Sequence, residues 1–179
     1  VLRDKNHHPS PESSNTSMRW CIDRPEAVQY VIDGQVFYAY KANNTANLLA
    51  DGDSIDIVVT AAPGVAPGFG FVARIGGTAE LDVYEDVTDV TGGTIFVPRN
   101  RNRTSDRVSQ VGVIINPTTV TATNPLYEEQ VIGGTGGNAS GATVSVDYAV
   151  IKSDTSYLFR LINRSGKARV AELYLQWSE

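Results

Sequence analysis

An alternation of apolar and polar residues at a spacing of two runs through this chain from Tyr30 onward. Successive side chains of a strand point to opposite faces, so this period is typical of half-buried strands in antiparallel sheets. The clearest run is at residues 171–177, where four apolar residues are expected to face inward. These are Ala171, Leu173, Leu175 and Trp177.

Eight further segments show the same period, and turn-forming pairs such as Asp51-Gly52 and Pro67-Gly68 lie between them. Many short strands separated by turns predict an all-β fold, an antiparallel jelly roll or β-sandwich. Helical periodicity is almost absent, and only residues 44–50 are expected to form a short helical turn. The eight segments are residues 36–40, 55–59, 69–75, 81–83, 95–97, 111–115, 144–150 and 157–161.

The domain organisation follows from a change of composition near residue 30. Residues 1–29 begin with a polar stretch that contains Pro9 and Pro11. We expect this segment to be an extended N-terminal arm that becomes ordered on a neighbouring subunit or partner. Residues 30–179 are expected to form one β-sandwich (jelly-roll) domain, a normal size for a single core.

Three arginines at a spacing of two, Arg99, Arg101 and Arg103, alternate with Asn100 and Asn102. On a strand they would form a row of guanidinium groups, with the asparagines on the other face. A guanidinium group binds carboxylates and phosphates with two parallel hydrogen bonds.

This arginine run has three interpretations. It binds phosphate or nucleic acid, it keeps an edge strand solvated, or it joins subunits through carboxylates of a partner. The net charge of −5 argues against a general nucleic-acid binder. We favour the subunit contact.

The residue inventory offers little for catalysis or metal binding. His7 and His8 are the only histidines, and both lie in the polar arm, so a Ser-His-Asp site or a histidine-based zinc site is not expected. The single cysteine, Cys21, forms no intrachain disulfide and resembles a small buried apolar residue. We expect no catalytic residue, no cofactor and no metal site.

Two acidic segments are candidates for other chemistry. Residues 51–56 have the carboxylate density of a calcium loop but lack its distal glutamate, so we expect a turn with Asp53 and Asp56 on solvated faces. A second patch is either a glycosidase carboxylate pair or, as we favour, a counter-surface for arginines of a neighbouring subunit. This patch contains Asp82, Glu85, Asp86 and Asp89.

The glycine-rich residues 133–141 resemble a phosphate-binding loop in composition only. Such loops open a helix, whereas residues 143–146 have the pattern of a strand. We expect a long hairpin connection.

The arginine run at residues 97–103 resembles the "YNRNRNS"-type motif of a family of tailed-bacteriophage virion proteins. Val97-Pro98 stands where that family more often has an aromatic residue followed by asparagine. Residues 34–40 and 157–177 resemble the same family, so the resemblance covers most of residues 30–179 in the same order. These are jelly-roll decoration, or cement, proteins that sit on icosahedral heads beside the major capsid protein.

The resemblance implies a structural protein on the outer surface of the virion capsid and no enzymatic activity. Its expected partners are the major capsid protein and further copies of itself, as a homodimer or homotrimer. No membrane contact and no direct nucleic-acid binding are expected. The candidate interface residues are Arg99, Arg101, Arg103, Arg107, Trp20 and Arg19.

Two alternatives stay open. One is a receptor- or carbohydrate-binding jelly roll of a tail fibre, although most of its candidate aromatic residues alternate with core positions. The other is a carboxylate-based glycan hydrolase using Asp82 or Glu85. The aromatic candidates of the first alternative are Tyr38, Tyr40, Tyr84, Tyr127 and Trp20.

Overall fold

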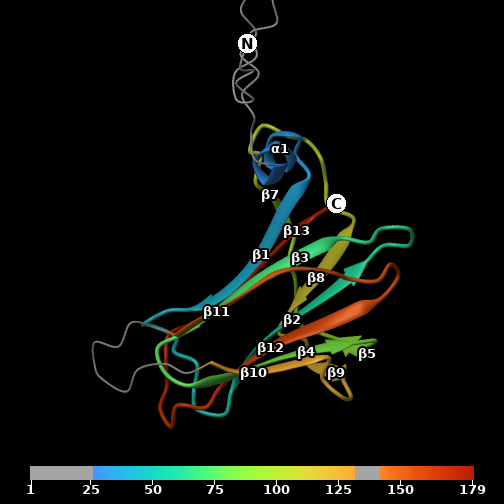
Figure 1. Cartoon of the computed structure of the whole chain (residues 1–179). Helices are drawn as coiled ribbons and strands as arrows, with labels where there is room; N and C mark the ends of the chain where they lie inside the picture. Colours follow the sequence, from blue (N-terminus) through green and yellow to red (C-terminus); the bar gives the residue numbers. More distant parts are fainter. Residues whose placement is uncertain (1–25, 132–141) are drawn as a thin grey trace, which may run out of the picture.

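Two antiparallel sheets pack face to face in the computed structural model, which describes residues 26–131 and 142–179 (Figure 1). Every strand pair in these residues is antiparallel, so the expected β-sandwich is confirmed. The five-stranded sheet has the order β11 (Ala142–Val150), β3 (Gly68–Ile75), β13 (Ala171–Ser178), β1 (Val36–Asn43) and β7 (Arg99–Asn100). The six-stranded sheet has the order β10 (Tyr127–Val131), β4 (Ala79–Glu85), β12 (Ser156–Asn163), β2 (Ser54–Ala61), β8 (Val111–Ile115) and β6 (Thr94–Ile95).

The main core lies between the two sheets and is built from their inward-facing residues. Aromatic rings connect the layers, since Phe69 of β3 stacks on Phe159 of β12 with ring centroids 6.1 Å apart. Trp177 of β13 is fully buried between Phe37 and Phe69. The inward face predicted for residues 171–177 is confirmed, because all four apolar residues of that run are buried.

A second, smaller core lies on the outer face of the six-stranded sheet. Two short strands, β5 (Thr88–Thr91) and β9 (Thr119–Thr121), pair with each other and cover Val58 and Leu158. The central strands β2 and β12 are therefore buried on both faces around Val58 and Leu158. This explains why their sequences are apolar without interruption at residues 57–59 and 157–159.

One helix, α1 (Glu26–Ile32), corrects the expectation that no stretch besides residues 44–50 is helical. It crosses the expected boundary between arm and sandwich at residue 29. The sequence signals were Pro25 before its first residue and Gly34 after its last turn. Gly34 has a φ of +68° and ends the helix in the left-handed conformation. Among the described residues, no helix is both long and apolar enough to cross a bilayer.

Two further expectations about secondary structure are wrong. Residues 44–50 form turns and a single bridge between Leu49 and Arg169 instead of a helical turn. The strand expected at residues 95–97 is limited to β6 at Thr94–Ile95. Strands β5, β9 and β10 were not predicted, because their polar residues form no alternating apolar run.

Candidate functional site

Residues 94–100 lie along one side of the sandwich and join its two sheets. Within them, β6 pairs with β8 at the edge of one sheet and β7 pairs with β1 at the edge of the other. Side chains alternate along this segment: Phe96 packs against the core, whereas Ile95 and Val97 are 81% and 74% exposed. Arg99 is also exposed. We call residues 94–103 the arginine edge.

The asparagines of the run hold the backbone in place. The Asn100 side chain is buried and donates a hydrogen bond to the carbonyl of Gly34 at 2.8 Å, while its oxygen accepts one from the Asn102 backbone at 2.8 Å. The Asn102 side chain donates to the carbonyl of Ile32 at 2.7 Å. Such side-chain-to-backbone bonds favour a turn over a continued strand. The expected three-arginine strand is therefore wrong after Asn100, where the chain bends.

The guanidinium groups consequently do not form a straight row, but all three remain exposed. Arg101 donates a hydrogen bond to the Gln176 side chain at 2.8 Å. Within residues 26–131 and 142–179, Arg99 and Arg103 form no hydrogen bond or ion pair through their side chains. Arg99 thus faces solvent on the same exposed segment as Ile95 and Val97, and Arg103 faces solvent after the bend.

Of the other candidate interface residues, Arg107 lies next to this edge, since the Asn100 side chain donates to its backbone carbonyl at 3.4 Å, and the rest lie outside the described part of the chain. Arg107 is exposed, and its guanidinium donates to the carbonyl of Glu179 at 2.9 Å. Arg19 and Trp20 lie outside the described residues, as do His7, His8 and Cys21.

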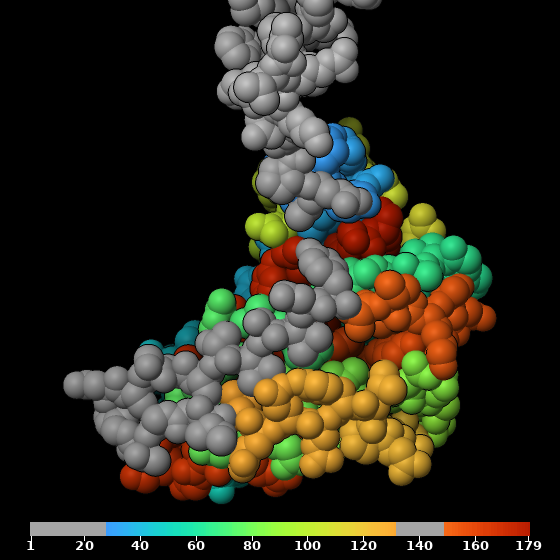
Figure 2. All heavy atoms as spheres, in the orientation of Figure 1, coloured from blue at the N-terminus to red at the C-terminus, as the bar shows by residue number. Residues whose placement is uncertain are grey.

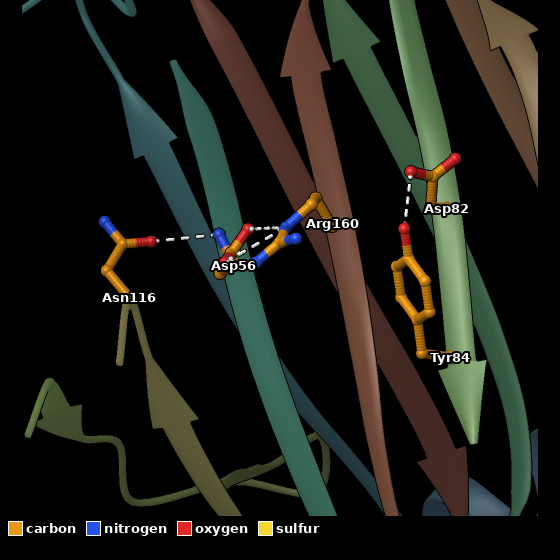
Figure 3. Close-up of polar contacts among 5 residues, drawn as sticks. All are labelled: Asp56, Asp82, Tyr84, Asn116 and Arg160. Carbon is orange, nitrogen blue, oxygen red and sulfur yellow. Dashed lines mark hydrogen bonds and ion pairs between the residues drawn. The ribbon is translucent and has the colours of Figure 1, made fainter. Parts of the chain in front are cut away.

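A polar cluster occupies the outer face of the six-stranded sheet (Figure 3). Arg160 lies directly opposite Asp56 in the register of β12 and β2 and donates to both of its carboxylate oxygens, at 3.0 and 2.6 Å. The bond to Asp56 raises the pKa of Arg160 above its ordinary value. Asp56 is buried, so the expectation that it lies on a solvated face is wrong. Its partner comes from a strand about a hundred residues away, which no local pattern reveals.

Asp82 lies on the other side of Arg160, on β4, and its side chain is almost completely buried. Tyr84 donates a hydrogen bond to one of its oxygens at 3.1 Å, and the other oxygen has no hydrogen-bond partner. Burial, together with repulsion from Glu80 and Glu128, raises the pKa of Asp82 above its ordinary value. Burial and Asp82 also raise the pKa of the Tyr84 hydroxyl.

We expect Asp82→Asn to stabilise the isolated chain at neutral pH by about 1 kcal/mol, the scale of relieving an unsatisfied buried group. Because the pKa of Asp82 is raised by folding, ionising it opposes the folded state. The free energy of unfolding of the wild-type chain therefore falls as the pH rises from the unfolded-state pKa of Asp82 through its folded-state pKa. The extra stability of Asp82→Asn should disappear below the unfolded-state pKa, where the carboxyl is protonated in both states. Urea unfolding of dilute protein at several pH values measures it.

The control for this prediction is Asp53→Asn, which removes the same charge from an exposed position. Its effect on the free energy of unfolding should be small. A loss of stability at neutral pH in Asp82→Asn would contradict the prediction.

The expected acidic patch is divided between two faces of β4. Glu85 accepts hydrogen bonds from Lys152 and from the Tyr157 hydroxyl, and Tyr157 belongs to the core between the sheets. The bond from Lys152 lowers the pKa of Glu85. Asp82 points to the opposite face of the same strand, so the two carboxylates do not form a pair across one cleft. The remaining members, Asp86 and Asp89, are exposed residues with positive φ.

Three tyrosines stack on the outer face of the five-stranded sheet. Tyr38 lies 6.4 Å from Tyr40 and 5.8 Å from Tyr174, measured between ring centroids. Phe96 of the arginine edge meets Tyr40 edge-on at 6.1 Å. Tyr174 was not among the aromatic candidates from the sequence, although it occupies one of the outward positions of residues 171–177. Of the other aromatic candidates, Tyr84 lies under Arg160 and Tyr127 packs on the main core.

Sequence reasoning also missed the buried ion pair and the apolar part of the arginine edge. The signal for the pair was a charged residue between apolar neighbours, at Asp56 in β2 and at Arg160 in β12. For Ile95 and Val97, the pattern predicts a strand but does not say which face is covered.

The described residues contain no group of three or more histidine, cysteine or acidic side chains placed to hold a metal ion. Residues 133–141 lie outside the described part of the chain. The strand expected to follow them is confirmed as β11.

Comparison of the chain with protein-family models, with curated proteins and with solved structures gives no match.

Proposed function

We propose that this chain is a bacteriophage virion structural protein: a decoration, or cement, protein on the outer surface of the head. It binds the major capsid protein and bridges neighbouring subunits, which stabilises the shell. The observation that carries the proposal is the arginine edge. It presents Ile95, Val97 and Arg99 along one exposed segment, with Arg103 exposed after the bend. Neither arginine has a carboxylate partner in the described part of its own chain. Exposed apolar side chains together with arginine are typical of protein interfaces.

The resemblance of residues 97–103 to decoration proteins supports the same role. A β-sandwich that binds its neighbours through exposed side chains can strengthen a shell. Packaged DNA presses the shell outward, and each bridge adds buried area and charge pairs between subunits. Many copies that each bind weakly act together, so the combined effect exceeds that of any single contact.

Copy number in purified virions tests the location. Quantitative mass spectrometry against the major capsid protein should give a simple ratio and many copies per particle. A few copies per virion would contradict a shell decoration protein and indicate a tail or fibre component.

Replacing Arg99, Arg101 and Arg103 together by alanine should lower capsid occupancy at least about tenfold, because each guanidinium supplies bidentate bonds to partner carboxylates. Occupancy is measured by co-sedimentation of the purified variant with heads that lack the protein. Unchanged occupancy would contradict the role of the arginine edge. A variant that removes three cations elsewhere on the surface is the matched control: Lys41→Ala, Arg74→Ala and Lys167→Ala.

A second candidate function is carbohydrate or receptor binding at a fibre tip. The row of Tyr38, Tyr40 and Tyr174 is the observation that favours it, since aromatic rings contribute large contact areas. A glycan array probed with the purified protein tests it. Binding that is lost in Tyr40→Ala, without loss of capsid occupancy, would favour this function.

A further inference from the structure

We propose that the arginine edge of one copy docks on an acidic face of a second copy, so that copies associate head to tail. The acidic face consists of Glu80, Asp82 and Glu128, which share the outer face of β4 and β10. The inference goes beyond the proposed function, because it assigns two surfaces through which copies of this chain meet.

The acidic face places like charges side by side. Glu128 of β10 lies directly opposite Asp82 of β4 in the register, and Glu80 is two residues from Asp82 on the same face of the strand. Like charges opposite each other destabilise a sheet. The raised pKa of Asp82 has Glu80 and Glu128 among its causes. A cation from outside would relieve this repulsion.

The chain's own nearby cations are already engaged. Arg160 donates to Asp56, and Arg164 donates to Glu80 at 2.8 Å. Glu128 is exposed and makes no hydrogen bond or ion pair through its side chain with any described residue. The second oxygen of Asp82, which lacks a partner, points away from Tyr84 (Figure 3). The face therefore has an excess of negative charge, and Glu128 is its exposed, unpaired carboxylate among the described residues.

The arginine edge is complementary in both charge and polarity. Arg99 and Arg103 provide cations without carboxylate partners among the described residues. Ile95 and Val97 add apolar contact area, and their counterpart is Leu126, which is 66% exposed directly before β10. Figure 2 shows the segment around β10 exposed on the face in view, in yellow-orange. Arginine with exposed apolar neighbours matches carboxylates with an exposed leucine.

The topology makes this contact head to tail. The six-stranded sheet begins with β10 and ends with β6, so the acidic face and the arginine edge lie at its opposite edges. One molecule cannot bring them together. When two copies meet through two different surfaces, the pair still has one free arginine edge and one free acidic face. Further copies can add at both, so the assembly closes into a ring or continues as a filament.

Reversing the charges on either surface tests the inference. In sedimentation velocity at low salt, the purified chain should self-associate. Arg99→Glu with Arg103→Glu should raise the dissociation constant at least about tenfold, and Glu80→Lys with Glu128→Lys should do the same. An equimolar mixture of the two double variants should associate again, because each offers the other a complementary pair of surfaces.

Two controls reverse exposed charges away from both surfaces: Lys167→Glu and Asp53→Lys. They should associate as the wild-type chain does. A wild-type chain that stays monomeric at all concentrations, or a mixture that stays monomeric, would overturn the inference. Because the assay contains no capsid, its outcome is independent of head occupancy, which tests the proposed function.

Discussion

Replacing Trp177 by alanine is expected to lower the free energy of unfolding by about 4 kcal/mol, the middle of the range for large aromatic core residues. Trp177 is fully buried in the central strand β13 and stacks on Phe69 with ring centroids 5.0 Å apart. Its indole N–H also donates to the Ser109 hydroxyl at 3.2 Å. Truncation leaves a cavity between the two sheets that neighbouring strands cannot fill, because both are held by paired backbones. Urea unfolding followed by circular dichroism measures the loss.

Trp177→Phe separates ring packing from the rest of the effect. Phenylalanine keeps an aromatic ring against Phe37 and Phe69 but leaves a smaller cavity and no bond to Ser109. We expect it to cost roughly half as much as alanine. Equal losses in the free energy of unfolding for the two variants would contradict the expectation that an aromatic ring at this position recovers about half of the loss.

Arg160→Ala is expected to destabilise the fold by about 3 kcal/mol, the cost of leaving one charge of a buried pair uncompensated. The side chains of Arg160 and Asp56 are only 28% and 11% exposed. Without the guanidinium, the Asp56 carboxylate loses its hydrogen-bonded cation on the covered face, and Tyr84 loses the cation above its ring. The same unfolding experiment measures the loss.

A double-mutant cycle gives the matched control. Asp56→Ala with Arg160→Ala should be less destabilising than Arg160→Ala alone, because no unpaired charge is left. The exposed pair of Arg74 and Glu172 provides the comparison: its side chains are 55% and 31% exposed, and Arg74→Ala should cost less than about 1 kcal/mol. Similar losses in the free energy of unfolding for Arg160→Ala and Arg74→Ala would contradict the prediction that burial sets the contribution of the pair of Asp56 and Arg160.

The periodic part of the fold was readable from the sequence. Strands β1, β2, β3, β4, β8, β11, β12 and β13 all lie where alternating or apolar runs predicted them. Burial on one face imposes that period, and the glycine, proline and asparagine pairs between the runs mark the turns. The short helix α1 was missed, since seven residues carry too little of a helical period to be detected.

The candidate site was readable only in part. The sequence by itself determined that the body of this chain forms antiparallel strands and that arginines gather at residues 99–103. Only the tertiary structure decided that Asn100 is a buried anchor that ends the strand, that Asp56 is paired with Arg160, and that β10 places Glu128 opposite Asp82. The physical reason is that side-chain alternation is a local property of the backbone. The partner of a charge is set by strand pairing between distant segments, and no local period encodes it.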